Sequence, residues 1–260
     1  MAGDRFMESR ESRIVLRSIN TLFSVGALTA LSDGELIERF GSRRDDAAEV
    51  AFSALVERHG PMVLRVCLDV LRDAHAAEDA FQTTFLILAR KAGSIRKRGS
   101  VASWLFGVAR RVAGRARADR ARRAVVERRG AATPEDQARD GPPPVLIPEV
   151  QEEVDRLPER YRAPIVLCYF EGLSHEEAAG RLRVPIGTVK VRLMRARERL
   201  RGRLTRRGLA PAVLAAALSR RAFAAVPSPV AESTIKAAGR LAACHPNPPP
   251  AAGPCSRPCS

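Results

Sequence analysis

The residues with the clearest chemical use lie between 173 and 200, where the sequence predicts a short helix, a tight turn and a long basic helix. Ser174 and Glu177 stand three residues apart and form a capping-box pattern that starts the first of these helices. Val184 to Gly187 supply the turn, and Thr188 is expected to open the second helix. This order of elements is typical of the helix-turn-helix, which places its second helix in the major groove of DNA.

The second of these helices has one apolar and one basic face. Its spacing predicts a buried stripe of Val189, Leu193, Ala196 and Leu200. Residues 181–207 contain eleven basic residues and a single acidic one, Glu198. A solvated basic helix would explain the charge, but not the short helix and tight turn before it. Because a recognition helix presents its first side chains to base edges and its later ones to phosphates, we assign to the DNA face Thr188, Lys190, Arg192 and Arg195.

A second basic stretch lies earlier in the chain. Residues 110–129 contain nine basic residues and two acidic ones, within a helix expected over about 101–123. Arginines spread around a helix suit salt-sensitive contacts with a DNA backbone. The first turns of this helix contain two aromatic residues. Trp104 either stacks on bases or anchors the helix, and Phe106 is expected in the core. A basic, glycine-flanked loop from Gly93 to Ser100 precedes it.

Composition narrows the class of partner. The chain has 260 residues, a net charge of +15 and a pI of about 11.0, which suits nucleic acid or an anionic membrane. A GC-rich genome would account for part of the total charge, but less for its distribution. The five cysteines form no metal-ligand pattern with nearby histidines, and no apolar run is long enough to span a membrane. We expect no metal, no cofactor and a reducing, cytoplasmic environment.

Helical periodicity dominates and no alternating strand pattern is present, so the predicted fold class is all-α. Two small helical domains are expected, over residues 32–129 and 149–207, joined by a flexible, proline-rich linker over 130–148. Residues 1–31 form an uncertain leader. Residues 208–260 form an Ala/Pro-rich C-terminal extension with helical potential in its first third and a disordered Pro/Ala/Cys tail.

Several single residues predict where helices begin or bend. In the first domain Ser32 and Asp73 are expected caps. The buried stripe over 47–71 contains Gly60-Pro61, which is expected to break or kink that helix. In the second domain Pro164 lacks an amide hydrogen, so the helix that contains it is expected to start late or kink.

Four stretches of this sequence resemble the extracytoplasmic-function sigma factors of bacterial RNA polymerase. The runs AEDAFQTTFLILARKA (77–92) and SWLFGVARRVA (103–113) are similar to region 2 of these factors. The runs over 157–179 and 187–200 are similar to their region 4. Together the motifs and their surroundings cover over half of the chain, in the family's order. The resemblance implies a factor that directs the polymerase to promoters and has no catalytic activity of its own.

The resemblance also implies roles for single residues of region 2. Asp79 and Gln82, on the helix around Phe85, match positions that dock on the clamp helices of the polymerase β′ subunit. The loop that contains Arg96 and Lys97 stands where such factors capture a flipped base of the −10 element. The helix that follows would contact the same element and its upstream edge through Trp104, Arg110, Arg111, Arg115 and Arg117.

Region 4 would read the −35 element with the four residues of the DNA face and touch the β flap of the polymerase. The resemblance implies core polymerase and promoter DNA as partners. It leaves open whether an anti-sigma factor is a third partner. Many relatives carry a small polar residue where this chain has Val191, so one −35 contact is apolar or absent. The C-terminal extension lies outside the two-domain core, and a regulatory role for it is a hypothesis.

Three other readings compete. A helix-turn-helix regulator with a sensing domain shares residues 173–200 but leaves 77–113 unexplained. A nuclease or recombinase would need converging carboxylates or a nucleophile set, whereas Asp45-Asp46 and Glu176-Glu177 are merely adjacent and the histidines are scattered. A membrane-surface protein fits the charge, but the apolar faces are used up in two cores.

Overall fold

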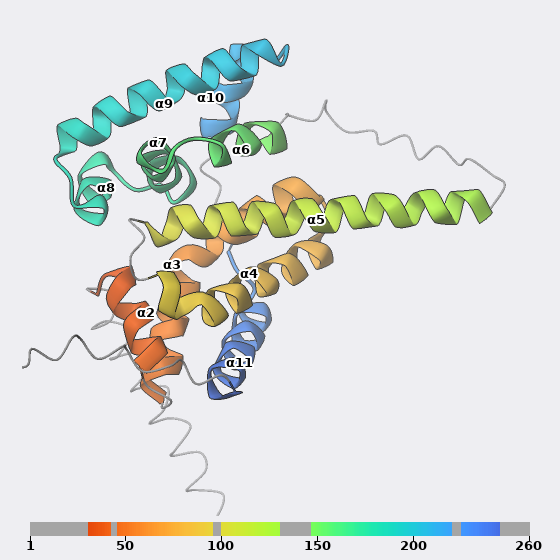
Figure 1. Cartoon of the computed structure of the whole chain (residues 1–260), viewed down its shortest axis with the longest axis vertical. Helices are drawn as coiled ribbons and strands as arrows, with labels where there is room; N and C mark the ends of the chain where they lie inside the picture. Colours follow the sequence, from red (N-terminus) through yellow and green to blue (C-terminus); the bar gives the residue numbers. More distant parts are fainter. Residues whose placement is uncertain (1–30, 43–45, 96–99, 131–146, 220–224, 245–260) are drawn as a thin grey trace, which may run out of the picture.

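Helices make up the described part of the chain, and α5 (Val101–Gly130) separates two groups of them (Figure 1). The computed structural model describes residues 31–42, 46–95, 100–130, 147–219 and 225–244. Within these ranges no residue is in a strand, which confirms the all-α prediction. The predicted leader, the loop residues 96–99 and most of the predicted linker lie outside the described residues.

The first module consists of α2 (Asp33–Ser42), α3 (Asp46–Leu71), α4 (Ala74–Ile95) and α5. Both predicted helix starts are confirmed. The Glu35 carboxylate accepts a hydrogen bond from the Ser32 N–H at 2.7 Å, and Asp73 Oδ1 accepts one from the Ala76 N–H at 2.8 Å. The core of the module contains a row of tilted or edge-on rings, Phe40, Phe52, Phe85 and Phe81, whose successive centroids lie 4.7 to 6.2 Å apart.

The helix α3 continues through Gly60-Pro61, so the prediction of a break there is wrong. A proline inside a helix removes one backbone hydrogen bond and costs about 3 kcal/mol. The neighbouring side chains His59, Met62 and Val63 are each no more than 1% exposed. Burial on both sides of the proline outweighs the lost bond, and local sequence alone does not show that burial.

The second module consists of α6 (Ile147–Asp155), α7 (Glu159–Ile165), the π-helical turn η1 (Val166–Phe170), α8 (His175–Leu182) and α9 (Ile186–Arg206). Pro164 lies inside α7, which starts five residues earlier, so the expected late start is wrong. The irregularity follows the proline instead. In η1 the Glu171 N–H donates to the carbonyl of Val166 at 3.0 Å, the wider spacing of a π-helix.

The two modules pack against each other, which the expectation of independent domains on a flexible linker did not include. Phe106 of α5 meets Phe170 of η1 edge-on, with the ring centroids 4.7 Å apart. Around this apolar contact the interface is polar. Gln151 donates to Asp69 at 2.9 Å, and Arg162 Nε donates to Ser103 Oγ at 2.9 Å.

His59 lies in that interface and is completely buried. Its Nδ1 is 2.5 Å from Oε1 of Glu171, and its Nε2 is 3.3 Å from Oδ2 of Asp33, an ion pair without hydrogen-bond geometry. Burial by itself would lower the pKa of His59, but the carboxylates of Glu171 and Asp33 raise it to about 10. Arg58 and Arg181 also contact Asp33, at 2.5 and 3.2 Å. A charged imidazolium therefore ties α2 and α3 to the second module.

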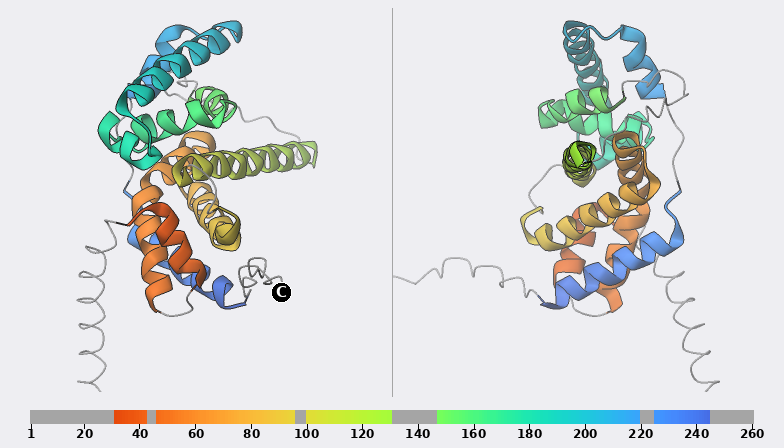
Figure 2. Two further views of the ribbon diagram at one scale, coloured as in Figure 1. Left: turned by 60° about the vertical axis from the view of Figure 1, so that its left-hand side comes forward. Right: turned by 90° about the vertical axis from the view of Figure 1, so that its right-hand side faces the viewer.

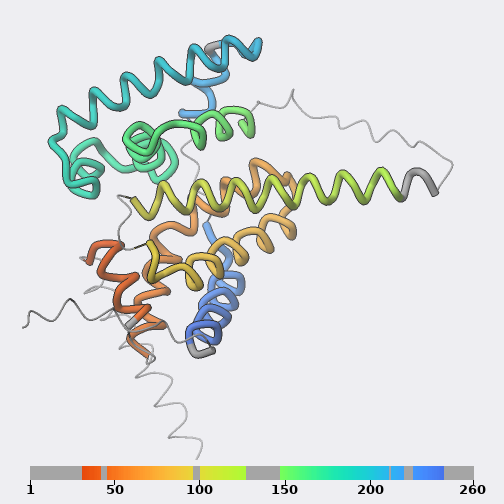
Figure 3. Tube along the Cα trace, viewed as in Figure 1, coloured from red at the N-terminus to blue at the C-terminus, as the bar shows by residue number. Residues whose placement is uncertain are grey.

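The described part of the C-terminal extension contains two helices. The first, α10 (Pro211–Ser219), confirms the helical potential predicted over 211–226 for its first nine residues, and it packs on α6 and α9. The second, α11 (Ser228–Cys244), crosses to the other module and packs on α3 and α4 (Figures 2 and 3). The prediction of a disordered tail is wrong over 228–244, and residues 245–260 lie outside the described residues. Apolar side chains at helical spacing are buried against the first module, and this packing stabilises the helix.

The buried imidazolium makes stability depend on pH. In the unfolded chain the pKa of His59 returns to its ordinary 6.5, so the folded state binds this proton more tightly. The stabilisation is complete below pH 6.5 and is lost as the pH rises through about 10. We therefore expect the urea midpoint to fall between about pH 6 and about pH 9.5.

Replacing His59→Gln should remove most of this slope and destabilise the fold by about 3 kcal/mol at neutral pH, because it leaves the buried Glu171 carboxylate without the imidazolium that pairs with it. His75→Gln, at an exposed position of α4, is the matched control and should keep the slope. An unchanged slope in the His59→Gln protein would contradict the assignment.

Candidate nucleic-acid interface

The turn between α8 and α9 is set by local chemistry. Ser174 Oγ accepts a hydrogen bond from the Glu177 N–H at 3.2 Å, and Glu177 Oε2 accepts one from the Ser174 N–H at 2.7 Å, which confirms the predicted capping box. Arg183 ends α8 with a left-handed φ of 52°. Pro185 follows at the start of α9, which begins two residues before Thr188, the predicted first residue.

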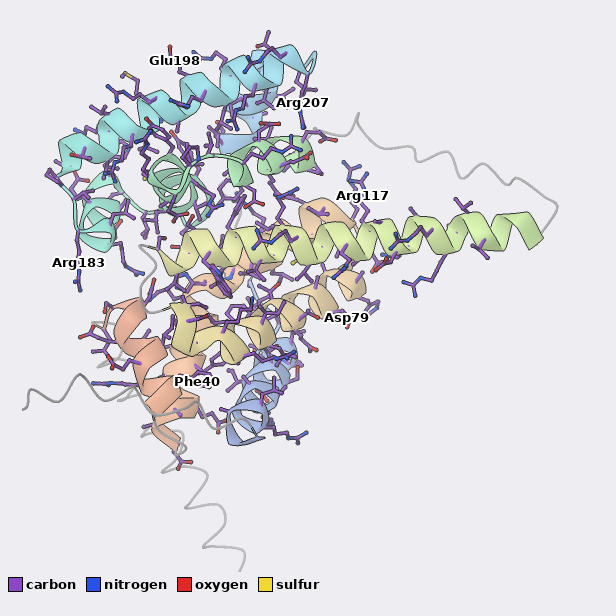
Figure 4. The ribbon with its side chains drawn as sticks, in the orientation of Figure 1. Phe40, Asp79, Arg117, Arg183, Glu198 and Arg207 are labelled. Carbon is purple, nitrogen blue, oxygen red and sulfur yellow. The ribbon has the colours of Figure 1, made fainter. Side chains whose placement is uncertain are left out.

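The predicted apolar stripe of α9 is confirmed, since its side chains are at most 2% exposed: Val189, Leu193, Ala196 and Leu200. On the outer side Lys190 and Arg195 are exposed, and Thr188 and Arg192 are half-buried. Glu198 also lies on this outer side and is the one acidic residue of α9 (Figure 4). The helix therefore packs through one face and presents a basic face to solvent.

A hollow beside the start of α9 brings three of the four predicted DNA-face residues together. Its walls are Arg160, Tyr161, Gly187, Thr188, Val191, Arg192 and Arg195. Lys190 is not among them. Two exposed apolar side chains also stand on this helix, Val191 at 45% and Met194 at 59% exposure. Arginine guanidinium groups and an apolar side chain thus share one concave surface.

Two tyrosines that the sequence analysis did not single out hold arginines of the basic face. The guanidinium groups of Arg160 and Arg199 each lie 4.9 Å from the ring centre of Tyr161. That of Arg197 lies 5.2 Å from the ring centre of Tyr169. Such contacts are worth about 0.5 to 1 kcal/mol at exposed sites and orient the arginines in advance. The tyrosines come from α7 and η1, so only tertiary packing places them beside α9.

A second basic surface follows α5, but less of it is accessible than the sequence predicts. Arg115 and Arg117 are exposed, and Arg117 projects outward from the helix (Figure 4). Arg110 and Arg111 face Asp155 of the second module, with N–O distances of 3.3 and 3.6 Å. Arg96 and Lys97 lie outside the described residues.

The burial of Trp104 bears on its two expected roles, stacking on bases and anchoring the helix. Its side chain is only 8% exposed, and Phe106 two residues later is completely buried. The expectation of core packing for Phe106 is confirmed. In this arrangement Trp104 anchors α5 within the fold and is not displayed for stacking on bases.

The predicted polymerase-docking residues of α4 differ in accessibility. Asp79 is exposed and lies on the outer side of the helix (Figure 4). Gln82 is half-buried, and its Nε2 donates to Ser233 Oγ of α11 at 2.9 Å. Phe85 is completely buried between Phe52 and Phe81, so it cannot touch a partner directly and instead holds α4 in place.

The described ranges also contain histidine, cysteine and acidic side chains. Among those residues no group of three or more His, Cys, Asp or Glu could hold a metal ion. Burial raises the pKa of the Cys67 thiol to about 12, which keeps it protonated and unreactive. None of the helices that the structure describes is both long and apolar enough to cross a membrane.

Comparison with known proteins assigns both modules. The sequence matches the family model "Sigma-70 region 2" over residues 55–123 and "Sigma-70, region 4" over residues 148–200, and neither match reaches α10 or α11. The RNA polymerase sigma-H factor of Pseudomonas aeruginosa is 31% identical over 183 residues, which cover 66% of this chain and 93% of that protein.

The ECF RNA polymerase sigma factor SigK of Mycobacterium sp. (strain JLS) is 34% identical over 160 residues, or 58% of this chain and 80% of that protein. Among solved structures, that of CnrH in complex with the cytosolic domain of CnrY aligns with 67% of this chain and 97% of its own. The sequence identity is 24% and the TM-score is 0.32.

The capping box gives a direct test of how the turn is held. Ser174→Ala removes the side-chain acceptor for the first turn of α8 and should lower the free energy of unfolding by about 1 kcal/mol. Urea denaturation measures the change. The control is Thr205→Ala near the end of α9, whose hydroxyl bonds only to the carbonyl of Arg201 in its own helix. It should change stability by about 0.5 kcal/mol or less, and equal losses in both proteins would contradict a special role for the cap.

Proposed function

The chain belongs to the extracytoplasmic-function (ECF) sigma factors of bacterial RNA polymerase, and we propose that its second module reads the −35 element while its first module engages the −10 element. Such a factor recognises promoters and starts transcription together with RNA polymerase. The observation that carries the division of labour is the two-faced geometry of α9, which packs through its apolar stripe and offers a basic hollow at its N-terminal end. A helix of this kind fits a major groove about 12 Å wide.

Within that hollow the residue types suit different parts of the duplex. Arg192 and Arg195 carry guanidinium forks that bind guanine edges or phosphates with two hydrogen bonds. Thr188 lies at the N-terminal end of α9, where a recognition helix approaches base edges most closely. Lys190 stands outside the hollow and suits a phosphate contact, which positions the helix but carries no sequence information.

For the −10 element the support comes from α5. Arg115 and Arg117 are exposed on this long helix and suit contacts with the DNA backbone. We propose that Arg110 and Arg111 join them once Asp155 moves away. In the arrangement described, both arginines pair with Asp155, although the Arg111 side chain is 58% exposed, so these ion pairs must break before both arginines contact DNA.

The remaining assignments follow from the same proposal. Asp79 and Gln82 of α4 dock on the β′ clamp helices, the second module touches the β flap, and the chain acts in the cytoplasm without catalytic activity of its own. An anti-sigma factor that covers these surfaces is a further proposed partner. A ligand-sensing helix-turn-helix regulator is disfavoured, because the first module matches sigma region 2 over residues 55–123.

The double change Arg192→Ala with Arg195→Ala tests the −35 assignment. It should weaken initiation from promoters that depend on a −35 element and reduce the salt slope of promoter binding by about two, while binding to core polymerase stays intact. The change Lys236→Ala with Arg240→Ala removes the same charge from the exposed side of α11 and serves as control. Equal loss of promoter activity and core binding would count against the assignment.

Val191 allows a test of whether α9 contacts a single base of the −35 element. An exposed apolar side chain on a recognition helix suits contact with the methyl group of thymine. Replacing the relevant −35 thymine by deoxyuridine removes one methyl, worth about 0.8 kcal/mol, and should weaken promoter binding roughly fourfold. The Val191→Ala protein should bind both DNAs alike. If Val191→Ala discriminated as well as the parent protein at every −35 thymine, the contact would be absent.

A further inference from the structure

The face of α4 that carries Gln82 is covered by α11. Gln82 Nε2 donates to Ser233 Oγ at 2.9 Å, across 151 residues of sequence. Ser233 Oγ in turn donates to the Val230 carbonyl of its own helix at 3.0 Å, so its remaining hydrogen-bonding capacity faces α4. In two views α11 lies along the first module on the side remote from α9 (Figures 1 and 2). A residue proposed to dock on polymerase is thus already engaged within the chain.

The contact extends beyond this hydrogen bond. Three α11 side chains four residues apart are buried against the first module: Val230 is 8% exposed, and Thr234 and Ala238 are fully covered. The Thr234 hydroxyl is satisfied within the helix, since it donates to the Val230 carbonyl at 2.6 Å. Burial at this spacing defines one face of a helix, so α11 is seated in a single orientation.

The segment just before α11 also packs closely on the first module. A β-carbon built on Gly60 would lie 2.9 Å from Val226 Cγ2, closer than real side chains approach, and 3.5 Å from the ring of Phe81. The absence of a side chain at Gly60 therefore makes room for Val226. Phe81 stands one residue before Gln82, so this contact borders the same face of α4.

The buried side chains of α11 are nonetheless small, namely valine, threonine and alanine, and Ile235 packs partly buried beside them. They bury less area than the phenylalanines of the core, so removing α11 exposes less apolar surface than opening the core would. Its outward residues Glu232, Lys236 and Arg240 are exposed and keep the detached helix compatible with water. A helix bound through such a surface is stable within the chain, where its effective concentration is high, and a large partner can displace it.

We propose that α11 and core RNA polymerase compete for the same face of the first module, so that the C-terminal extension restrains the factor until α11 is displaced. This rests on the proposed function, in which Asp79 and Gln82 dock on polymerase. The restraint also favours the closed arrangement, since α10 packs on the second module and α11 on the first. When only a fraction of molecules has α11 undocked, the affinity for polymerase falls by that fraction.

The test measures binding of the full chain to purified core polymerase. Thr234→Arg with Ala238→Arg places two long cations in the buried stripe and undocks α11 while leaving α4 unchanged. We expect core affinity to rise about tenfold or more, as for a site masked nine-tenths of the time or more. The chain truncated after residue 225, which lacks α11, should show the same rise in affinity for core polymerase. The control Glu232→Ala with Lys236→Ala changes only exposed positions of α11 and should bind like the parent.

The outcomes separate the two proposals. If neither the parent chain nor any variant binds core polymerase, the proposed function fails. If all bind with equal affinity, the factor docks on polymerase but α11 does not compete, and this inference is overturned.

A second measurement does not depend on variants that fold poorly. In the unmodified protein, amide hydrogen exchange over 228–244 should accelerate when core polymerase is added. Unchanged or increased protection of α11 in that complex would equally overturn the inference.

Discussion

A buried positive charge governs how the two modules meet. His59 has no contact with water, and its charged form depends on Asp33 from the first module and Glu171 from the second. Placing a cation in such surroundings without both carboxylates would be strongly unfavourable, so the closed arrangement is specified by charge as well as by apolar contact. The apolar part of the interface includes Phe106 and Phe170, and the buried apolar side chains of both modules form one continuous cluster. Charge and apolar burial together fix how the two modules dock.

The polar character of the interface has a second effect, which concerns α5. Under the proposed function, two of its arginines pair with two different anionic groups at different times. In the closed arrangement Arg110 and Arg111 face Asp155, and on a promoter the same groups would face phosphates. The Asp155 carboxylate therefore binds these arginines where a DNA phosphate would bind them. The free energy lost when this ion pair breaks is recovered when the arginines bind the DNA backbone. Exchange between equivalent partners lowers the net cost of opening, compared with exposing an apolar surface.

Local patterns predicted the elements well, and contacts across the chain less so. Ser32, Asp73 and the Ser174–Glu177 box mark helix starts because capping needs only neighbours in sequence. The stripe of α9 was readable from its spacing. Tyr161, beside Arg199, and the continuity of α3 through Pro61 depend on packing by distant segments, which one sequence does not display. The same limit applies to α11, since its packing on α3 and α4 joins segments far apart in the sequence.

The position of α11 at the far end of the chain has a consequence for biosynthesis. Gln82 leaves the ribosome 151 residues before its partner Ser233. The first module is complete at Gly130, 103 residues before Ser233. At bacterial elongation speeds of about 5 to 20 residues per second, it therefore exists for roughly 5 to 20 s without α11. During that interval the nascent chain displays the face of α4 that α11 later covers. Under the proposed competition, the chain therefore binds polymerase more readily before α11 has been synthesised than after.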